Sequence, residues 1–293
     1  MCGIIGVAIR NETKIVETLT AIYENQKYRG QQGAGFGVRK ADGSMFRCRC
    51  RSPGKALRFL ANRQSLEPGD LLIFHHRYPT STPNYPAFNH PIANEDGSMY
   101  LIHNGHISND AELLSKLGNE HQFETLLGEE ASKRKFITDS EVIIHLLEDE
   151  MGSQGLEEGF RAMAKRVRGS LAIAVMSKSW DKLMLFKNGN PLEVFKDPQG
   201  NVWFSSVMPD KGFEKITSLC DGELGSFGIE GYECVADFEE LKVKTTQAVY
   251  YCDEIDLSNW MPKGRRRYCS VCGEETAGNH KYCEWCYGNI KGK

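Results

Sequence analysis

The chain is 293 residues long, with 40% hydrophobic and 26% charged residues, which is typical of a globular protein with a substantial core. Its formal net charge of −3 excludes a general attraction to nucleic acid or to anionic lipid. No stretch approaches the roughly 20 apolar residues of a membrane helix, and no secretory signal is visible. We therefore expect a cytoplasmic protein whose 10 cysteines are reduced thiols, metal ligands or a nucleophile.

Hydrophobic periodicity predicts strands and helices in the first part of the chain and short strands in the second. Strands, then helices, then strands again indicate α+β layers rather than a βαβ repeat. We expect a large domain at residues 2–252, a linker at 253–262 and a small module at 263–293. The predicted elements are, in chain order, strand 3–9, helix 14–28, strand 36–38, helix 55–64, strands 70–75 and 99–103, helices 109–117, 140–150 and 156–167, and strands 171–176, 182–186, 192–195, 202–205, 226–229, 233–235 and 244–251.

The first candidate for catalysis is Cys2, which becomes the first residue when the initiator methionine is removed. It then carries a thiol and a free α-amine, whose ordinary pKa values lie near ~8.5 and ~8. An N-terminal amine is one way to activate a nucleophile in the same residue. The alternative is a small residue at a frayed terminus, and the two glycines that flank the apolar run Gly3–Gly6 argue against it.

Three further positions carry groups that such a nucleophile needs. Asn104 and Gly105 follow a predicted strand and offer an amide and a backbone N–H for an oxyanion, although an Asn-Gly pair is also a common turn. Arg77 ends a strand and fits a carboxylate, although most lone arginines are solvated or structural. Asp139 opens a helix, where it is either part of a capping motif or a partner for a substrate ammonium.

Taken together and in this order, these motifs resemble the class II glutamine amidotransferase domain of the N-terminal-nucleophile hydrolase type. The resemblance covers roughly residues 2–250. The matching motifs are Cys2-Gly3-Ile4-Ile5-Gly6, Tyr28-Arg29-Gly30, Gly33-Ala34-Gly35, His76-Arg77-Tyr78-Pro79-Thr80, Asn89-His90-Pro91, His103-Asn104-Gly105, Thr138-Asp139-Ser140-Glu141, Gly169-Ser170-Leu171-Ala172-Ile173-Ala174 and Lys187-Asn188-Gly189-Asn190-Pro191-Leu192.

The resemblance implies a four-layer αββα sandwich, L-glutamine as the substrate and a role for each matching residue. Cys2 would attack the side-chain amide and form a glutamyl thioester, with its own α-amine as the base. Asn104 and Gly105 would stabilise the oxyanion. Arg77 would bind the α-carboxylate of glutamine and Asp139 its α-ammonium. Water would then release glutamate, and ammonia would pass to an acceptor.

The sequence departs from part of the family at Tyr78 and Ser81, where some relatives carry tryptophan and histidine. This leaves Thr80 with two interpretations, a contact to the substrate carboxylate or a loop cap. Relatives usually continue into a large synthase domain, whereas only about forty residues follow the predicted hydrolase domain here. The resemblance therefore implies a separate ammonia-accepting synthase subunit, or a plain glutaminase.

Several other histidines and cysteines are expected to have structural roles. His75, His76 and His90 could serve metal or acid–base chemistry, but in this context we assign them no function. Cys48 and Cys50 are expected to be reduced thiols on opposite sides of one strand or in one loop.

The C-terminal module contains two Cys-x-x-Cys pairs ten residues apart, a spacing that predicts a structural Zn²⁺ site in a zinc ribbon. An iron–sulfur site and a redox pair are the alternatives. The module has seven Lys or Arg against three Glu, a net charge of +4. We rank docking to a protein partner first, contact with nucleic acid second and an inert cap third. The predicted zinc ligands are Cys269, Cys272, Cys283 and Cys286.

Two functions from different classes fit this sequence. The first is a glutamine-hydrolysing subunit that supplies ammonia to a synthase on a separate chain. The second is a catalytically silent hydrolase-fold scaffold, tethered through its zinc ribbon to nucleic acid or to a protein complex. The presence of all the nucleophile, oxyanion and substrate-binding residues argues for the enzyme, and the acceptor of the ammonia stays open.

Overall fold

In the computed structural model, the chain divides into two compact units, Met1–Ala248 and Val249–Lys293. The structure describes residues 2–79, 86–117, 121–126, 137–152 and 154–241 of the first unit. In the second it describes only the backbone of an antiparallel strand pair, β14 (Arg267–Tyr268) and β15 (Glu275–Thr276). The predicted strand at 244–251 and the four predicted zinc ligands lie outside the described residues.

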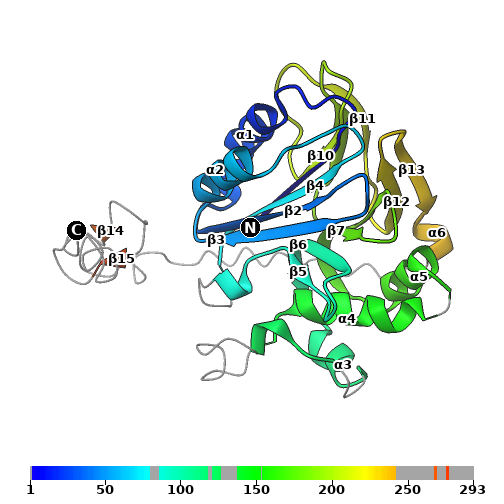
Figure 1. Ribbon diagram of the computed structural model, residues 1–293. Coiled ribbons are helices and arrows are strands. Elements are labelled where there is room, and N and C mark those ends of the chain that lie inside the picture. The colour runs from blue at the N-terminus through cyan, green and yellow to red at the C-terminus, as the bar shows by residue number, and fades with distance from the viewer. Residues whose placement is uncertain are drawn as a thin grey trace, which may run out of the picture. The chain divides into compact units, whose positions relative to one another are not determined.

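The first unit contains two antiparallel sheets, in agreement with the two β layers that the resemblance implies (Figure 1). Sheet A has the strand order β11-β9-β10-β1-β4-β2-β3 and sheet B the order β13-β12-β8-β7-β6-β5. The strands of sheet A are β1 (Gly3–Ala8), β2 (Gly33–Arg39), β3 (Met45–Cys50), β4 (Leu71–Arg77), β9 (Glu193–Lys196), β10 (Val202–Ser205) and β11 (Glu214–Ser218). Those of sheet B are β5 (Ile92–Ala93), β6 (Met99–Ile107), β7 (Gly169–Ser177), β8 (Leu183–Asn188), β12 (Glu223–Gly228) and β13 (Gly231–Ala236).

Side chains alternate between two cores along the central strands, as the period of a strand requires. In β1, Ile4 packs between the two sheets, whereas Ile5 and Val7 pack beneath helices on the outer face of sheet A. In β7, Ala172 packs between the sheets and Ile173 beneath helices on the outer face of sheet B. Because both faces of these strands are buried, each sheet is held between two apolar layers.

The helices cover the outer faces of the sheets (Figure 1). Helices α1 and α2 pack on sheet A, and α4 and α5 pack on sheet B. Each predicted helix is present with its ends shifted by a few residues. The helices are α1 (Ile15–Gln26), α2 (Pro53–Arg63), α3 (Asp110–Leu114), α4 (Asp139–Met151), α5 (Leu156–Arg166) and α6 (Phe238–Leu241), with short 3₁₀ turns at Lys27–Arg29, Pro86–Phe88 and Glu124–Leu126.

The sequence analysis missed the strands β3 and β11 at the two edges of sheet A. β3 is partly buried and β11 is mostly exposed, so their apolar alternation is weak. The prediction that Cys48 and Cys50 lie on opposite sides of a strand is wrong. Their Sγ atoms are 3.6 Å apart, because residues i and i+2 of a strand share a face.

Candidate active site

The register of sheet A brings Cys2 and Arg77 to the same edge. β1 pairs antiparallel with β4, and Gly3 lies opposite His76. The next residue outward is therefore Cys2 on one strand and Arg77 on the other. A Cβ on Gly3 would lie 2.0 Å from Nε2 of His76. Only glycine therefore leaves room for the His76 ring next to Cys2.

Hydrogen bonds hold the backbone that directly follows the Cys2 side chain. Nε of Arg29 donates to the carbonyl of Cys2 at 2.9 Å, and the N–H of Ile4 donates to Oγ of Ser206 at 3.0 Å. The thiol itself lies 3.8 Å from the carbonyl of Tyr78. Burial raises the pKa of the Cys2 thiol, while the positive charge of Arg77 acts in the opposite direction. The thiol is therefore protonated near neutral pH and needs a base before it can attack.

Sheet B contributes the end of β6. Asn104 is buried, and its carbonyl accepts a hydrogen bond from Nδ2 of Asn190 at 2.9 Å. Its side-chain Nδ2 is buried without a hydrogen-bond partner in the described part of the chain. Gly105 has a φ of 143°, and a Cβ there would lie 2.0 Å from the carbonyl oxygen of Ser170. This strand end therefore combines an unpaired amide donor with a backbone that only glycine can adopt.

Asp139 lies in the first turn of α4, and the helix is capped as the sequence predicts. Thr138 is the N-cap residue, and its hydroxyl accepts from the N–H of Glu141 at 3.2 Å. Only half of the capping box forms, because the carboxylate of Glu141 instead accepts from the N–H of Thr125 at 3.1 Å. Burial raises the pKa of Glu141 to about 7.

The carboxylate of Asp139 is tied to sheet B. Its Oδ2 accepts from the N–H of Ile107 at 3.1 Å and lies 3.6 Å from Nδ1 of His106. Burial opposes ionisation of this group, but His106, His103 and the Ile107 N–H together lower the pKa of Asp139 to about 2. Asp139 is therefore an anion at neutral pH.

A cavity of about 360 Å³ joins these elements. Its volume lies in the range of small-molecule sites. Of the predicted site residues, it is lined by Cys2, Arg77, Gly105 and Asp139. Asn104 immediately precedes Gly105 in β6. Thr80 falls outside the described residues.

The cavity is also lined by His90, His103 and His106, to which the sequence assigned no role. His90 and His103 are buried, and burial lowers the pKa of each ring, so both are neutral. His90 packs on His75 with ring centroids 4.2 Å apart. His103 and His106 lie next to the Asn104-Gly105 motif in the sequence, and this proximity could have placed them at the site. No such proximity connects His90 to the motif, and its position depends on the fold.

Comparison with known proteins gives the family of the domain. Residues 81–210 match a family model described as a glutamine amidotransferase domain. The chain is 31% identical over 238 residues to glutamine–fructose-6-phosphate aminotransferase (isomerizing) of Thermococcus kodakarensis, a match that covers 79% of this chain and 37% of that protein. The same enzyme of Thermus thermophilus is 32% identical over 244 residues, with 82% and 37% covered. The chain thus spans little more than a third of these relatives.

Solved structures with the same fold include glutamine phosphoribosylpyrophosphate amidotransferase of B. subtilis, with a TM-score of 0.59, 19% identity and coverage of 80% of this chain and 48% of that chain. An allosteric regulatory enzyme of purine biosynthesis gives a TM-score of 0.60 at 20% identity, with the same coverage. At these identities the likeness concerns the fold alone. No helix among the described residues is long and apolar enough to cross a membrane. From the family match, the aligned relatives and the shared fold, we conclude that the chain carries an enzyme domain of the class II glutamine amidotransferase type.

Proposed function

We propose that this domain hydrolyses the side-chain amide of L-glutamine, with Cys2 as the nucleophile. The observation that supports this most strongly is the shared cavity, in which a thiol, a guanidinium and a carboxylate face one space. The guanidinium belongs to Arg77 and the carboxylate to Asp139. A zwitterionic amino acid with a side-chain amide complements all three groups.

The proposed reaction begins with removal of Met1, which gives Cys2 a free α-amine with an ordinary pKa near ~8. The amine takes the proton of the thiol, and the sulfur forms a bond to the amide carbon. The amine then returns the proton to the amide nitrogen, and the carbon–nitrogen bond breaks. Ammonia departs, and a glutamyl thioester remains on Cys2. Water attacks the thioester and releases glutamate, which restores the thiol.

The negative charge that develops on the amide oxygen needs preorganised donors. We assign this role to Nδ2 of Asn104 and the N–H of Gly105. The buried Nδ2 has no hydrogen-bond partner in the described part of the chain, and an unpaired buried donor costs free energy unless a ligand completes it. The negative charge of the tetrahedral intermediate would supply that acceptor.

We assign recognition of the two charged ends of glutamine to Arg77 and Asp139. Arg77 is buried, so a carboxylate bound there is largely removed from water. The low pKa of Asp139 keeps it ionised for a substrate ammonium. A site that offers a cation and an anion discriminates against amides that lack either charged end, because such an amide loses one charge-assisted contact. Thr80 stays a proposed carboxylate contact.

The ammonia acceptor belongs to the proposal as well. The relatives in the comparison are named as aminotransferases, and we propose that this domain supplies ammonia to a synthase on a separate chain. The C-terminal module would then bind Zn²⁺ through Cys269, Cys272, Cys283 and Cys286 and dock a protein partner or nucleic acid. Copurification of the full chain with a synthase tests the first part, and zinc analysis of the Cys269→Ser variant tests the second.

A glutaminase assay tests the chemistry. Protein whose mass shows that Met1 is removed should release glutamate from glutamine, and Cys2→Ala should release none. Cys220→Ala is the matched control, because it removes an exposed thiol outside the cavity. Protein extended at the N-terminus should be inactive, because the α-amine of Cys2 is then an amide. Glutamate release by Cys2→Ala at the rate of the parent protein would refute the proposal.

A further inference from the structure

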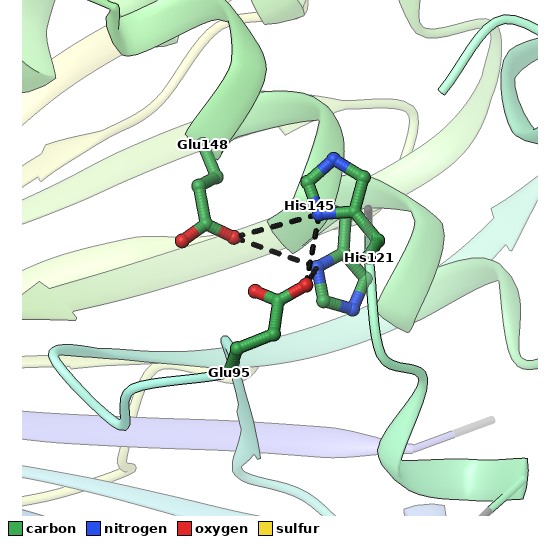
Figure 2. Close-up of side chains that lie close together, drawn as sticks. All are labelled: Glu95, His121, His145 and Glu148. Atoms are coloured by element: carbon green, nitrogen blue, oxygen red, sulfur yellow. Dashed lines mark hydrogen bonds and ion pairs between the residues drawn. The ribbon is translucent and has the colours of Figure 1, made fainter. Parts of the chain in front are cut away.

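A second cluster of chemically reactive side chains lies on the outer side of sheet B (Figure 2). His145 and Glu148 are three residues apart on α4, so they share one face of the helix. Glu95 follows β5 and His121 follows α3, so the cluster joins three separate segments. None of these four residues takes part in the proposed glutamine chemistry.

Four atoms of the cluster face one point, as Figure 2 shows. Nδ1 of His121 lies 2.9 Å from Oε1 of Glu95 and 3.9 Å from Oε2 of Glu148. Nδ1 of His145 lies 3.3 Å and 3.5 Å from the same two oxygens. All four atoms are within 4.8 Å of one another. Tetrahedral ligands at the bond lengths of zinc, about 2.0–2.2 Å, are roughly 3.3–3.6 Å apart. The four nitrogen–oxygen distances, 2.9 to 3.9 Å, lie on either side of that spacing, so small side-chain shifts would complete a coordination shell.

Burial gives a second, independent observation. The side chain of His145 is fully buried, and neither of its ring nitrogens makes a hydrogen bond within the described residues. Oε2 of Glu148 is likewise buried without a hydrogen bond. Nδ1 of His145 and Oε2 of Glu148 lie 3.5 Å apart, and the lack of a hydrogen bond at either buried atom is costly. A cation at that point would satisfy both.

The surrounding groups orient the ligands in the way that metal sites require. Nε2 of His121 donates to Oδ1 of Asp149 at 2.9 Å, which leaves Nδ1 as the coordinating nitrogen. Oε1 of Glu148 accepts from Nδ2 of Asn94 at 3.0 Å, which leaves Oε2 facing the cluster. The outer contacts thus fix the orientation of one histidine and one carboxylate.

We propose that Glu95, His121, His145 and Glu148 bind a divalent transition-metal ion of the zinc class. Two imidazoles with two carboxylates suit such an ion better than Ca²⁺ or Mg²⁺, which prefer oxygen ligands. Four protein ligands close the shell, so the ion is structural.

The consequence concerns the glutamine pocket, because α4 also carries Asp139 in its first turn. His145 lies six residues further on, about 9 Å along the helix axis. The ion would fasten Glu95 and His121 to α4 and so stabilise one wall of the pocket.

Zinc stoichiometry of the full chain tests this proposal separately from the cysteine module. The parent protein, Glu148→Gln and Glu150→Gln are stripped with a chelator, reloaded with excess Zn²⁺, desalted and measured by mass spectrometry of the metal. Glu148→Gln removes one ligand charge at a half-buried position. Glu150→Gln is the matched control, since Glu150 lies on the same helix as Glu148 but pairs with Arg166 of α5. We expect Glu148→Gln to hold one zinc ion fewer per chain than the other two proteins.

Thermal unfolding is the second readout. Zn²⁺ should raise the Tm of the stripped parent protein and of Glu150→Gln by more than that of Glu148→Gln. If Glu148→Gln does not fold, His121→Gln, outside the helices, replaces it. Equal zinc content and equal Tm shifts in parent, ligand variant and control would overturn the proposal and leave the cluster an ion-pair network.

Discussion

The two sheets contribute to the pocket in different ways. Sheet A supplies Cys2 and Arg77 from adjacent positions of one strand pair, so its share is fixed by the β1–β4 register. Sheet B supplies Gly105 from a strand and Asp139 from a helix that must dock on it. The hydrogen bond from the Ile107 N–H to Asp139 makes that connection. The positions of Cys2 and Arg77 are therefore set by strand pairing within one sheet. The position of Asp139 depends on how helix α4 packs on sheet B.

The two sides of the pocket also differ in the protonation state of their reactive groups. In sheet A, burial raises the pKa of the Cys2 thiol, so the nucleophile is held in its neutral form. In the part built on sheet B, His106 and the N–H of Ile107 hold Asp139 as an anion in spite of its burial. A pocket that combines a protonated thiol with a fixed anion suits a substrate with a cationic group, and it suits the α-amine of Cys2 as the proposed base. Variants on the two sides should accordingly fail in different ways.

The largest effect after loss of Cys2 is expected at Asn104. Asn104→Ala should lower kcat by roughly 10²–10³-fold, the usual cost of one oxyanion donor. It should leave the Tm nearly unchanged, because Nδ2 has no hydrogen-bond partner in the described part of the chain. Steady-state kinetics and thermal unfolding measure the two quantities.

Asn190→Ala provides the contrast within sheet B. Nδ2 of Asn190 donates to the carbonyls of Asn104 and Ser170 at 2.9 and 3.0 Å. Removing it leaves one buried and one partly buried acceptor without this donor and should cost about 1–3 kcal/mol of unfolding free energy. A large Tm loss in Asn104→Ala with little loss of kcat would reverse these assignments and make Asn104 a structural residue.

The next largest effect is expected on KM and substrate specificity, when the charge of Arg77 or of Asp139 is removed. Arg77→Gln and Asp139→Asn should each raise KM for glutamine by roughly 10–100-fold, the cost of one charged hydrogen bond. Arg77→Gln should lose discrimination against 4-aminobutanamide, which lacks the α-carboxylate. Asp139→Asn should lose discrimination against glutaramic acid, which lacks the α-ammonium. Competition kinetics with the two amides measures this, and a variant that keeps the discrimination it should lose would contradict the assignment.

The sequence predicts the half of the site in sheet A better than the half in sheet B. A strand at residues 3–9 and another at 70–75 already imply that Cys2 and Arg77 can meet at one edge. The capping pattern at Thr138 located the start of α4, but not the strand end to which Asp139 is bonded. Only the packing of α4 on sheet B provides that pairing.

The edge strands and the candidate metal cluster could not be predicted from the sequence, for related reasons. The residues of β3 are partly buried and those of β11 mostly exposed, so the alternation that identifies a strand is weak. Glu95 and His121 lie outside the helices and strands, far along the chain from His145. No fixed spacing marks such a site, and only the folded chain brings the ligands together.

The smallest expected effect is a pH dependence that arises in sheet B. The Asp139 carboxylate raises the pKa of His106, which is largely exposed at the pocket. Protonated His106 is paired with Asp139, so it competes with the substrate ammonium. The pairing is complete below the ordinary pKa of histidine, about 6.5, and is lost as pH rises through the raised value. Asp139, with a pKa of about 2, stays ionised throughout this range and adds no titration of its own.

KM for glutamine should therefore rise as pH falls through the raised pKa of His106, by a few-fold at most because the pair is exposed to solvent. His106→Asn should have a KM that is flat across the same range and close to the high-pH value of the parent protein. Steady-state kinetics between about pH 5.5 and 8, a range that spans the ordinary histidine pKa, measures both proteins. The same rise in KM in His106→Asn would assign the titration elsewhere, with the α-amine of Cys2 as the first alternative.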